Sequence, residues 1–577
     1  MRSDANTARY SAANFFLEAL SEVGIDYLFS NFGTDHAPLI EAAAGRRQRG
    51  QVLPKIILCP HESTAGHMAG GYALATGRGQ GVLVHVDVGT ANTSIAMHNL
   101  FRSRIPVFLM AGKAPFTTHG EIAGSRDNYV HFVQEPFDQG SLVRPYVKWE
   151  WTLPSGVVAK ETVRRAHTIM QSEPKGPVYL MLPRETLSEV WNEQDIHAFP
   201  ADRFGATVPS GADPALIDAL VEKLLAAHHP ILITSFGGRT PGTSEAIEAL
   251  AAFAGIRVFE SNMVNAIAHE GPCFSGFQPA AHMKQADLGL LVDSDVPWIP
   301  KDAAANAQLF WAQIDLDVLK ANSPMWSFPA HLRLNGNSAR ILTQVLEVLE
   351  ARATPAFRKA ADERLQTIAL ERAKRLDAVA KLADNKGRPG EINAHYLCRE
   401  IGKRIGPEDF IMQEAARNGP AMAQQIPRPV AGSMVRVAGG GLGASGGMAL
   451  GVKLARPQHL SVQILGDGGF YLNNPSSVYA VSKQYGLPIF TIVLDNSGWS
   501  AVKESTLRMY PDGDAKALQS YEAELAPNVD FSKVIEAFGG YGEKLADPEQ
   551  VEAAIDRCLR EVRGGRSALL HACVTRL

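Results

Sequence analysis

The stretch that decides the fold is Ser461-Val-Gln-Ile-Leu465, followed by Gly466-Asp467-Gly468-Gly469 and Phe470. An apolar run that ends in glycines predicts a buried strand, a tight turn and then a helix, which we expect near Ser476. The glycines would let backbone N–H groups approach a phosphate, and the helix start would favour an anion. Asp467 stands where a carboxylate would hold Mg²⁺ against that phosphate. Taken alone, the stretch fits an ordinary structural turn equally well.

A second polar strand end follows at a suggestive distance. The apolar run Ile489–Leu494 leads into Asp495-Asn496-Ser497-Gly498, and the 26 residues from Gly469 to Leu494 suffice for a helix and a strand. Such a crossover places two parallel strands side by side. Ligands bind at the carboxyl ends of neighbouring strands in an open sheet. The spacing therefore favours a phosphate and metal site over a simple turn.

The same strand, turn and helix pattern recurs along the 577 residues. Apolar residues between Ala12 and Val23 lie on one helical face, and a short strand is expected at Ile25–Phe29. Near the other end, Asp547-Pro548-Glu549-Gln550 predicts a capped helix start. The pattern predicts an α/β protein with three doubly wound parallel-sheet domains. We expect domains at 1–190, 205–352 and 391–577, a charged linker at 353–390, and middle-domain strands at Ile231–Thr234, Leu288–Val292 and Leu309–Ile314.

Composition limits the possible partners. The net charge is −4, with 56 basic and 60 acidic residues, so no electrostatic case exists for nucleic acid or an anionic membrane. Apolar runs of about 18 residues are missing, and the start lacks the pattern of a signal peptide. The five cysteines form no CxxC pair, which is typical of free thiols in a reducing cytoplasm.

A carboxylate in the first block stands out. Glu62 follows the apolar run Ile56–Leu58 and opens a helix of small residues. This position suits a buried functional acid, although a first-turn glutamate also stabilises a helix electrostatically. A zinc-protease motif is excluded, because His61 and His67 are six residues apart and HExxH requires four.

Together these stretches resemble the thiamine diphosphate family of acetolactate synthase, pyruvate oxidase and benzoylformate decarboxylase. Gly466-Asp467-Gly468 with Asp495-Asn496 resembles its diphosphate signature, and Glu62 with Gly71-Tyr72-Ala73 resembles its pyrimidine signature. The resemblance implies pyrimidine-binding, middle and diphosphate-binding domains. It also implies Mg²⁺ ligands from Asp467, Asn496 and the Gly498 carbonyl, and a diphosphate held by Gly466, Gly468, Gly469 and Asn496. Asp495 departs from the family, which has asparagine there.

The resemblance assigns further cofactor contacts. Glu62 would share a proton with the aminopyrimidine, which requires a raised pKa in an apolar pocket. Gly89 and Asn92 match a family loop, whereas Asp87 and Val88 do not. Gly441-Leu-Gly-Ala-Ser-Gly446, after an expected strand at Met434–Ala438, formally matches a dinucleotide fingerprint. The resemblance implies instead that this is the loop under the bent cofactor, with Gly443 in contact with the cofactor. The family has a large apolar residue there that supports the bend; this chain has Ser445, and Met448 is the candidate to replace that support.

Substrate-pocket candidates come from the same comparison. Thr34 and His36, in Gly33-Thr34-Asp35-His36, resemble the loop beside the thiazolium, and Gln134 lies in a segment resembling Phe-Gln-Glu. The alternative for His36 is a turn with a solvated histidine. Trp499, Glu414 and Asn418 are further pocket candidates. Val292–Trp298 replaces the Arg-Phe-Asp-Asp-Arg run of FAD-binding relatives, which argues against FAD.

The resemblance implies decarboxylation of a 2-oxo acid, with or without carboligation, by a C2 ylid generated through Glu62. It also implies a homodimer or homotetramer, in which Glu62 of one subunit faces the metal turn of another. Two alternatives stay open: a FAD-linked oxidase of the same fold, and a catalytically silent regulatory paralogue. The sequence does not name the substrate.

Overall fold

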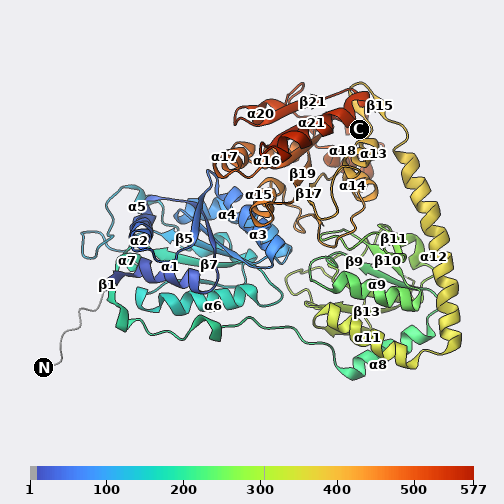
Figure 1. Cartoon of the computed structure of the whole chain (residues 1–577), viewed down its shortest axis with the longest axis horizontal. Helices are drawn as coiled ribbons and strands as arrows, with labels where there is room; N and C mark the ends of the chain where they lie inside the picture. Colours follow the sequence, from blue (N-terminus) through green and yellow to red (C-terminus); the bar gives the residue numbers. More distant parts are fainter. Residues whose placement is uncertain (1–8, 304–305, 577) are drawn as a thin grey trace.

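Three parallel sheets organise the chain in the computed structural model, which describes residues 9–303 and 306–576. Figure 1 shows the first domain at the left, the third at the top and the middle domain at the lower right. The prediction of parallel α/β domains is confirmed. The sequence predicts no signal peptide at the start of the chain. Residues 1–8 of that start lie outside the described residues. The expected domain boundaries stay predictions, although each six-stranded sheet falls inside one of the predicted ranges.

The sheet of the first domain has the strand order β3-β2-β4-β5-β7-β6. The predicted strand at Ile25–Phe29 is found two residues later. Its elements are β2 (Tyr27–Asn31), β3 (Lys55–Leu58), β4 (Gln80–Val84), β5 (Val107–Lys113), β6 (Glu150–Thr152), β7 (Val178–Pro183), α1 (Ala12–Glu22), α2 (Ala37–Gln48), α3 (Glu62–Thr76), α4 (Val86–Arg102), α5 (Val130–Val133), α6 (Ala159–Gln171) and α7 (Arg184–Ser188). A small antiparallel pair, β1 (Arg9–Ser11) and β8 (Val190–Asn192), lies at its edge.

The middle domain has the order β11-β10-β9-β12-β13-β14. The predicted strands are confirmed within a residue. Its elements are β9 (Pro230–Thr234), β10 (Arg257–Glu260), β11 (Phe274–Gly276), β12 (Leu288–Val292), β13 (Phe310–Asp315), β14 (Leu332–Asn335), α8 (Pro214–Ala226), α9 (Thr243–Ala254), α10 (Ala280–Met283) and α11 (Ser338–Arg352). The charged segment after it forms one long helix, α12 (Pro355–Leu382), which leads to the third domain along the right edge of Figure 1.

The third domain has the order β18-β17-β19-β20-β22-β21, the same chain-order pattern as the first. Its elements are β17 (Phe410–Glu414), β18 (Met434–Val435), β19 (Ser461–Gly466), β20 (Phe490–Asp495), β21 (Tyr541–Leu545), β22 (Ala568–Cys573), α13 (Ala394–Gly402), α14 (Gly419–Gln425), α15 (Ser445–Ala455), α16 (Asp467–Leu472), α17 (Pro475–Tyr485), α18 (Ser500–Met509), α19 (Asp514–Leu518), α20 (Ser532–Glu536) and α21 (Val551–Arg563), with the short pair β15 (Gly387–Arg388) and β16 (Glu391–Ile392) before it.

Two details of the third domain differ from the sequence prediction. The helix expected near Ser476 is preceded by a shorter one, α16, that begins at Asp467 itself. Glycine-rich turns are hard to place because their residues also fit the first turn of a helix. The strand expected at Met434–Ala438 pairs over two residues only, because Arg436 N turns to the carbonyl of Val264 in the middle domain.

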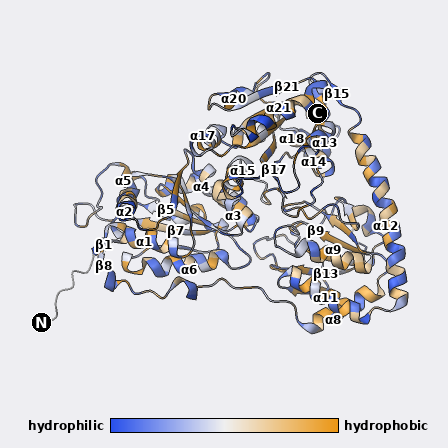
Figure 2. Ribbon diagram, viewed as in Figure 1, coloured by the Kyte–Doolittle hydropathy of each residue, from blue (hydrophilic) through white to orange (hydrophobic). Residues whose placement is uncertain are grey.

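The first and third domains meet through α3 and α15, which occupy the same place in the two sheets' chain order. Small residues let the helices approach at backbone distance. A Cβ at Gly71 would lie 2.1 Å from the Met448 carbonyl oxygen, and one at Gly451 would lie 2.0 Å from that of Met68. A side chain at either glycine would therefore force the helices apart. Figure 2 shows the hydrophobic residues concentrated in the sheets on either side.

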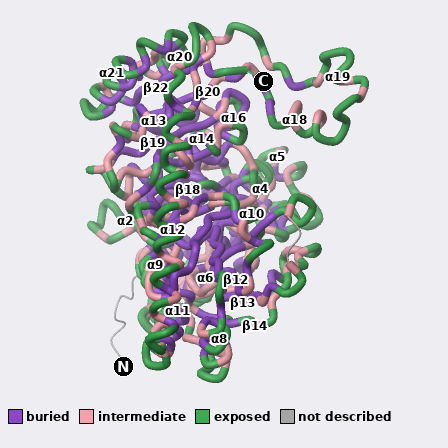
Figure 3. The backbone as a smooth tube through the Cα atoms, turned by 90° about the vertical axis from the view of Figure 1, so that its right-hand side faces the viewer, coloured by how far each residue is buried: buried purple, intermediate pink, exposed green. Residues whose placement is uncertain are grey.

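One segment extends away from these cores. Figure 3 shows α18 and α19 projecting from the third domain with mostly exposed residues. Met509 and Leu518 on this segment are 67% and 76% exposed. Among the described residues, no helix has both the length and the apolar character needed to cross a membrane.

Candidate functional site

The side chains of Asp467 and Asn496 and the Gly498 carbonyl converge at the carboxyl ends of β19 and β20. One terminal atom of the Asn496 amide lies 2.8 Å from the Gly498 carbonyl oxygen and 3.2 Å from Asp467 Oδ1. With its nitrogen at this position Asn496 donates a hydrogen bond to both oxygens, and with its oxygen there the three oxygens can surround a cation. A carboxylate, an amide oxygen and a backbone carbonyl are the ligands that hard divalent cations prefer. The donor set therefore fits Mg²⁺, and it brings together the three residues predicted from the sequence.

Electrostatics and backbone geometry support this reading. Burial, and then repulsion by Asp495, raise the pKa of Asp467 to about 6. Gly498 has a φ of 146°, and a Cβ there would lie 2.2 Å from the Ala523 carbonyl oxygen. Only glycine fits this position without strain. Gly468 is restricted as well, because the indole of Trp499 covers it.

Asp495 has a partner that sequence reasoning missed. His571 Nε2, on β22, lies 2.8 Å from Asp495 Oδ2, and the backbone N–H of Ser497 donates to Asp495 Oδ1 at 2.8 Å. Burial would raise the pKa of Asp495, but His571 and Ser497 outweigh it and lower the pKa. Asp495 thus has a hydrogen-bonding role of its own. A histidine in a buried strand, 76 residues away, was the only sequence signal.

Glu414 holds the glycine loop from below. Its carboxylate accepts hydrogen bonds from Ser445 N at 2.8 Å and Asn473 Nδ2 at 3.1 Å, and it also contacts Gly443 N and the Ser445 hydroxyl. Burial raises the pKa of Glu414. The Ser445 side chain therefore turns into the domain. Met448 lies in the core beside α3, and its support of a cofactor stays a prediction.

Glu62 begins α3 at the carboxyl edge of the first sheet. His61 caps the helix by accepting from Ser63 N at 3.1 Å, and Glu62 is 8% exposed. Its Oε2 accepts a hydrogen bond from Asn92 Nδ2, on α4, at 3.0 Å. The predicted pair is thus brought together, with Asn92 holding one carboxylate oxygen in place.

A buried group of two histidines and a carboxylate lies at the same edge. Asp35 contacts His85 Nδ1 and lies 3.3 Å from His36 Nε2, while His85 Nε2 lies 2.9 Å from Gln134 Oε1. His36 is fully buried, so the alternative of a solvated histidine is wrong. Thr34, by contrast, is exposed. The sequence analysis did not select His85 as a site residue. Its position directly after the buried strand β4, at the start of the helix that carries Asn92, was the available signal.

The pKa values of Asp35, His36 and His85 depend on one another. Burial would raise the pKa of Asp35, but His36 and His85 lower it below its usual value. Burial lowers the pKa of His36, whereas the hydrogen bond to Asp35 raises the pKa of His85. His85 is the more exposed histidine and the one that favours the protonated form. A Cβ at Gly112 would lie 1.3 Å from Asp35 Oδ2, so glycine is needed behind the carboxylate.

The two edges are linked through α4. Asn99, two turns after Asn92, donates to the Gly441 carbonyl at 2.9 Å and accepts from Gly441 N at 3.2 Å. His67 Nε2 lies 3.2 Å from the same Asn99 amide. The first domain therefore holds the beginning of the glycine loop in the third domain.

Two known sequence families match the chain, one over the segment that holds each edge. The family described as "Thiamine pyrophosphate enzyme, N-terminal TPP binding domain" matches residues 10–142, which include Glu62 and His85. The family described as "Thiamine pyrophosphate enzyme, C-terminal TPP binding domain" matches residues 421–572, which include Asp467 and Asn496.

Individual proteins match over nearly the whole chain. The acetolactate synthase large subunit of Haemophilus influenzae is 23% identical over 95% of this chain and 92% of its own. A benzoylformate decarboxylase of Pseudomonas aeruginosa is 26% identical over 94% and 95%. Among solved structures, a thiamine diphosphate-dependent 4-hydroxybenzoylformate decarboxylase from Rhodococcus jostii matches with a TM-score of 0.75 and 19% identity, over 98% of this chain and 99% of that one.

Proposed function

Since this chain belongs to the thiamine diphosphate-dependent enzymes of the acetolactate synthase and decarboxylase family, we propose that it decarboxylates a 2-oxo acid, with or without joining the product to a second carbonyl. The observation that carries the proposal is that one chain holds a buried acid, Glu62, at one sheet edge and a carboxylate, an amide and a carbonyl, from Asp467, Asn496 and Gly498, at another. Thiamine diphosphate, when bound, supplies a carbon nucleophile and accepts the electron pair released when the bond beside the carbonyl breaks.

The third domain would hold the charged end of the cofactor. Asp467, Asn496 and the Gly498 carbonyl would bind Mg²⁺, and the backbone of Gly466, Gly468 and Gly469 would face the diphosphate. Bound Mg²⁺ would hold Asp467 ionised, because a nearby cation lowers the pKa of a carboxyl group. Glu414 and Asn99 would keep the Gly441–Ser445 loop in one conformation beneath the cofactor.

The first domain would move protons. Asn92 fixes one oxygen of Glu62, which leaves the other for a proton shared with the aminopyrimidine. His85, with its pKa raised by Asp35, would donate a proton to the substrate or product at a step that needs an acid. Gln134 orients the His85 ring through Nε2, and His36 flanks the carboxylate on its other side.

We propose that two copies of the chain complete each site, Glu62 of one facing the metal turn of the other. Large apolar side chains stay exposed around both edges: Tyr129, Val133 and Phe137 near Gln134, and Val502 and Met509 beyond the metal turn. Exposed apolar clusters of this kind mark interfaces.

Cys59, Cys273, Cys398 and Cys558 are buried free thiols, which supports a place in the reducing cytoplasm.

Calorimetry and product analysis test the proposal. Thiamine diphosphate should bind with Mg²⁺ and should not bind the Asp467→Ala variant. The loaded enzyme, incubated with a panel of 2-oxo acids, should release an aldehyde or a hydroxyketone identified by mass spectrometry. Glu62→Gln should bind the cofactor and lose turnover. Unchanged turnover in Glu62→Gln would refute the proton role, and cofactor binding without any turnover of the panel would favour the silent paralogue.

A further inference from the structure

The middle domain has a ligand crevice that the chain fills with its own side chain. Strand order reverses between β9 and β12, and open α/β sheets bind ligands at such a switch point. Arg104, just past α4 of the first domain, reaches into this place. Its guanidinium lies 2.8 Å from Asp295 Oδ1 and 3.2 Å from Asp315 Oδ1, and 4.8 Å from the Phe236 ring centre.

The charges in the crevice are balanced internally. Lys320 Nζ lies 2.7 Å from Asp295 Oδ1 and 2.6 Å from Asp315 Oδ2. Burial, and then the nearby Asp315, raise the pKa of Asp293 to about 6. Arg104 and Lys320 thus hold the carboxylates that line the crevice. An extended dinucleotide would have to displace Arg104, which is only 7% exposed, from two ion pairs.

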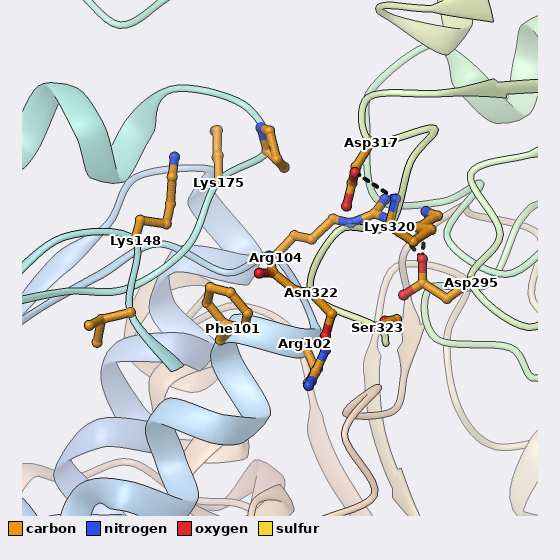
Figure 4. Close-up of a pocket in the computed structure, with 12 residues that line it drawn as sticks. Phe101, Arg102, Arg104, Lys148, Lys175, Asp295, Asp317, Lys320, Asn322 and Ser323 are labelled. Carbon is orange, nitrogen blue, oxygen red and sulfur yellow. Dashed lines mark hydrogen bonds and ion pairs between the residues drawn. The ribbon is translucent and has the colours of Figure 1, made fainter. Parts of the chain in front are cut away.

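Beside Arg104 lies a cavity of about 360 Å³ between the first and middle domains. Figure 4 shows Phe101, Lys148 and Lys175 on one side, Asp295, Asp317 and Lys320 on the other, and Arg104 between them. Five of the lining residues are basic and two are acidic: Arg102, Arg104, Lys148, Lys175 and Lys320 against Asp295 and Asp317. Arg104 and Lys320 are paired with Asp295 and Asp315, so the excess of positive charge in the cavity comes from Arg102, Lys148 and Lys175.

The acidic residues are already engaged, but three of the basic ones are not neutralised by them. Asp295 binds Arg104 and Lys320, and Asp317 accepts from Lys320 N at 3.0 Å. Arg102 donates to the Asn322 carbonyl at 2.9 Å, Lys148 to those of Ile169 and Ser172, and Lys175 to that of Gly77 at 3.0 Å. Glu173 interacts electrostatically with both lysines and is also paired with Arg239.

We propose that this cavity binds a small molecule bearing phosphate or carboxylate oxyanions and that the ligand joins the first domain to the middle domain. Multiple guanidinium and ammonium donors recognise such oxyanions through charge-assisted hydrogen bonds. The volume is at the lower end of ligand pockets, so it suits a phosphate monoester or a dicarboxylate. Burial lowers the pKa of Lys148 to about 8, and a bound anion would raise it again. The inference does not depend on the reaction proposed above.

Calorimetric titration of the cofactor-loaded protein tests the site, with inorganic phosphate in one arm and succinate in the other. We expect one saturable site per chain for at least one probe, and the arm that binds identifies the oxyanion. Arg102→Glu and Lys175→Met should weaken binding at least about ten-fold. Lys381→Met, on the exposed face of α12, is the matched control and should leave the affinity unchanged.

Two outcomes would overturn the proposal. One is the absence of saturable binding for both probes. The other is binding that Arg102→Glu and Lys175→Met leave unchanged, which would place the anion elsewhere. Because the bound cofactor occupies the diphosphate turn throughout the titration, anion binding at that turn does not contribute to the signal. Thermal unfolding of each variant without anion shows whether the fold is intact.

Discussion

The contact between Asn99 and the glycine loop makes the first domain a determinant of cofactor affinity. Asn99→Ala removes both hydrogen bonds to the Gly441 backbone and the contact with His67. A hydrogen bond contributes about 1 kcal/mol net, so the ordered conformation of the loop should lose about 2 kcal/mol of stabilisation. If the bound loop must be ordered, thiamine diphosphate should bind roughly 10- to 30-fold more weakly.

The assay is a calorimetric titration of thiamine diphosphate at saturating Mg²⁺. Ser94→Ala is the matched control, since Ser94 lies on the same helix and bonds the carbonyls of Thr90 and Leu142 but not the loop. Asn99→Asp keeps the acceptor for Gly441 N but sets a buried carboxylate oxygen against the Gly441 carbonyl, so its affinity should fall at least as far as that of Asn99→Ala. A dissociation constant within two-fold of wild type for Asn99→Ala would refute the reasoning.

Three further predictions concern single residues. Gly498→Ala should abolish Mg²⁺-dependent cofactor binding, because its Cβ would meet the Ala523 carbonyl at 2.2 Å and its φ of 146° strains any L side chain; full binding by calorimetry would contradict this. Burial lowers the pKa of His67 to about 4, below its unfolded value, so the unfolded chain binds more protons and stability falls as the pH drops from 6.5 toward 4. Between pH 7 and pH 5 this group should lower the free energy of unfolding by about 2 kcal/mol. In denaturant titrations, His67→Gln should lessen this acid-induced loss of stability. Asp35→Asn should lower the pKa of His85 and shift the matching limb of the kcat/KM profile to lower pH; an unmoved limb would exclude His85 as the titrating group.

The sequence predicted the parts of the site that depend on local pattern. Asp467, Asn496 and Gly498 each follow a strand in a fixed turn, so their spacing along the chain sets their convergence. Glu62 and Asn92 were each predicted from the resemblance as cofactor contacts, and the hydrogen bond between them follows from the packing of α3 beside α4. For the three residues after β19 and β20, strand order and strand length together determine the geometry.

The rest depends on contacts that no local pattern encodes. His571 meets Asp495 only because β22 pairs with β20, and Asn99 reaches Gly441 only because α3 packs on α15. Arg104 is harder still, because its direction depends on a left-handed φ of 56° at the end of α4 and on the docking of a separate domain. A basic residue after a helix predicts only a solvated end.

The repeated strand order explains how one fold serves two kinds of chemistry. In both outer domains the third strand of the sheet is followed directly by a candidate site residue, His85 after β4 and Asp467 after β19. The first domain surrounds this position with imidazoles and a carboxylate, whereas the third surrounds it with a carboxylate, an amide and a backbone carbonyl. Because equivalent helices α3 and α15 pack together, each chain presents one edge of each kind, and a second copy would supply the complementary edges. The switch point of the middle domain is closed by Arg104 of the first domain, and an anion bound in the cavity at their junction would add a second link between the two domains.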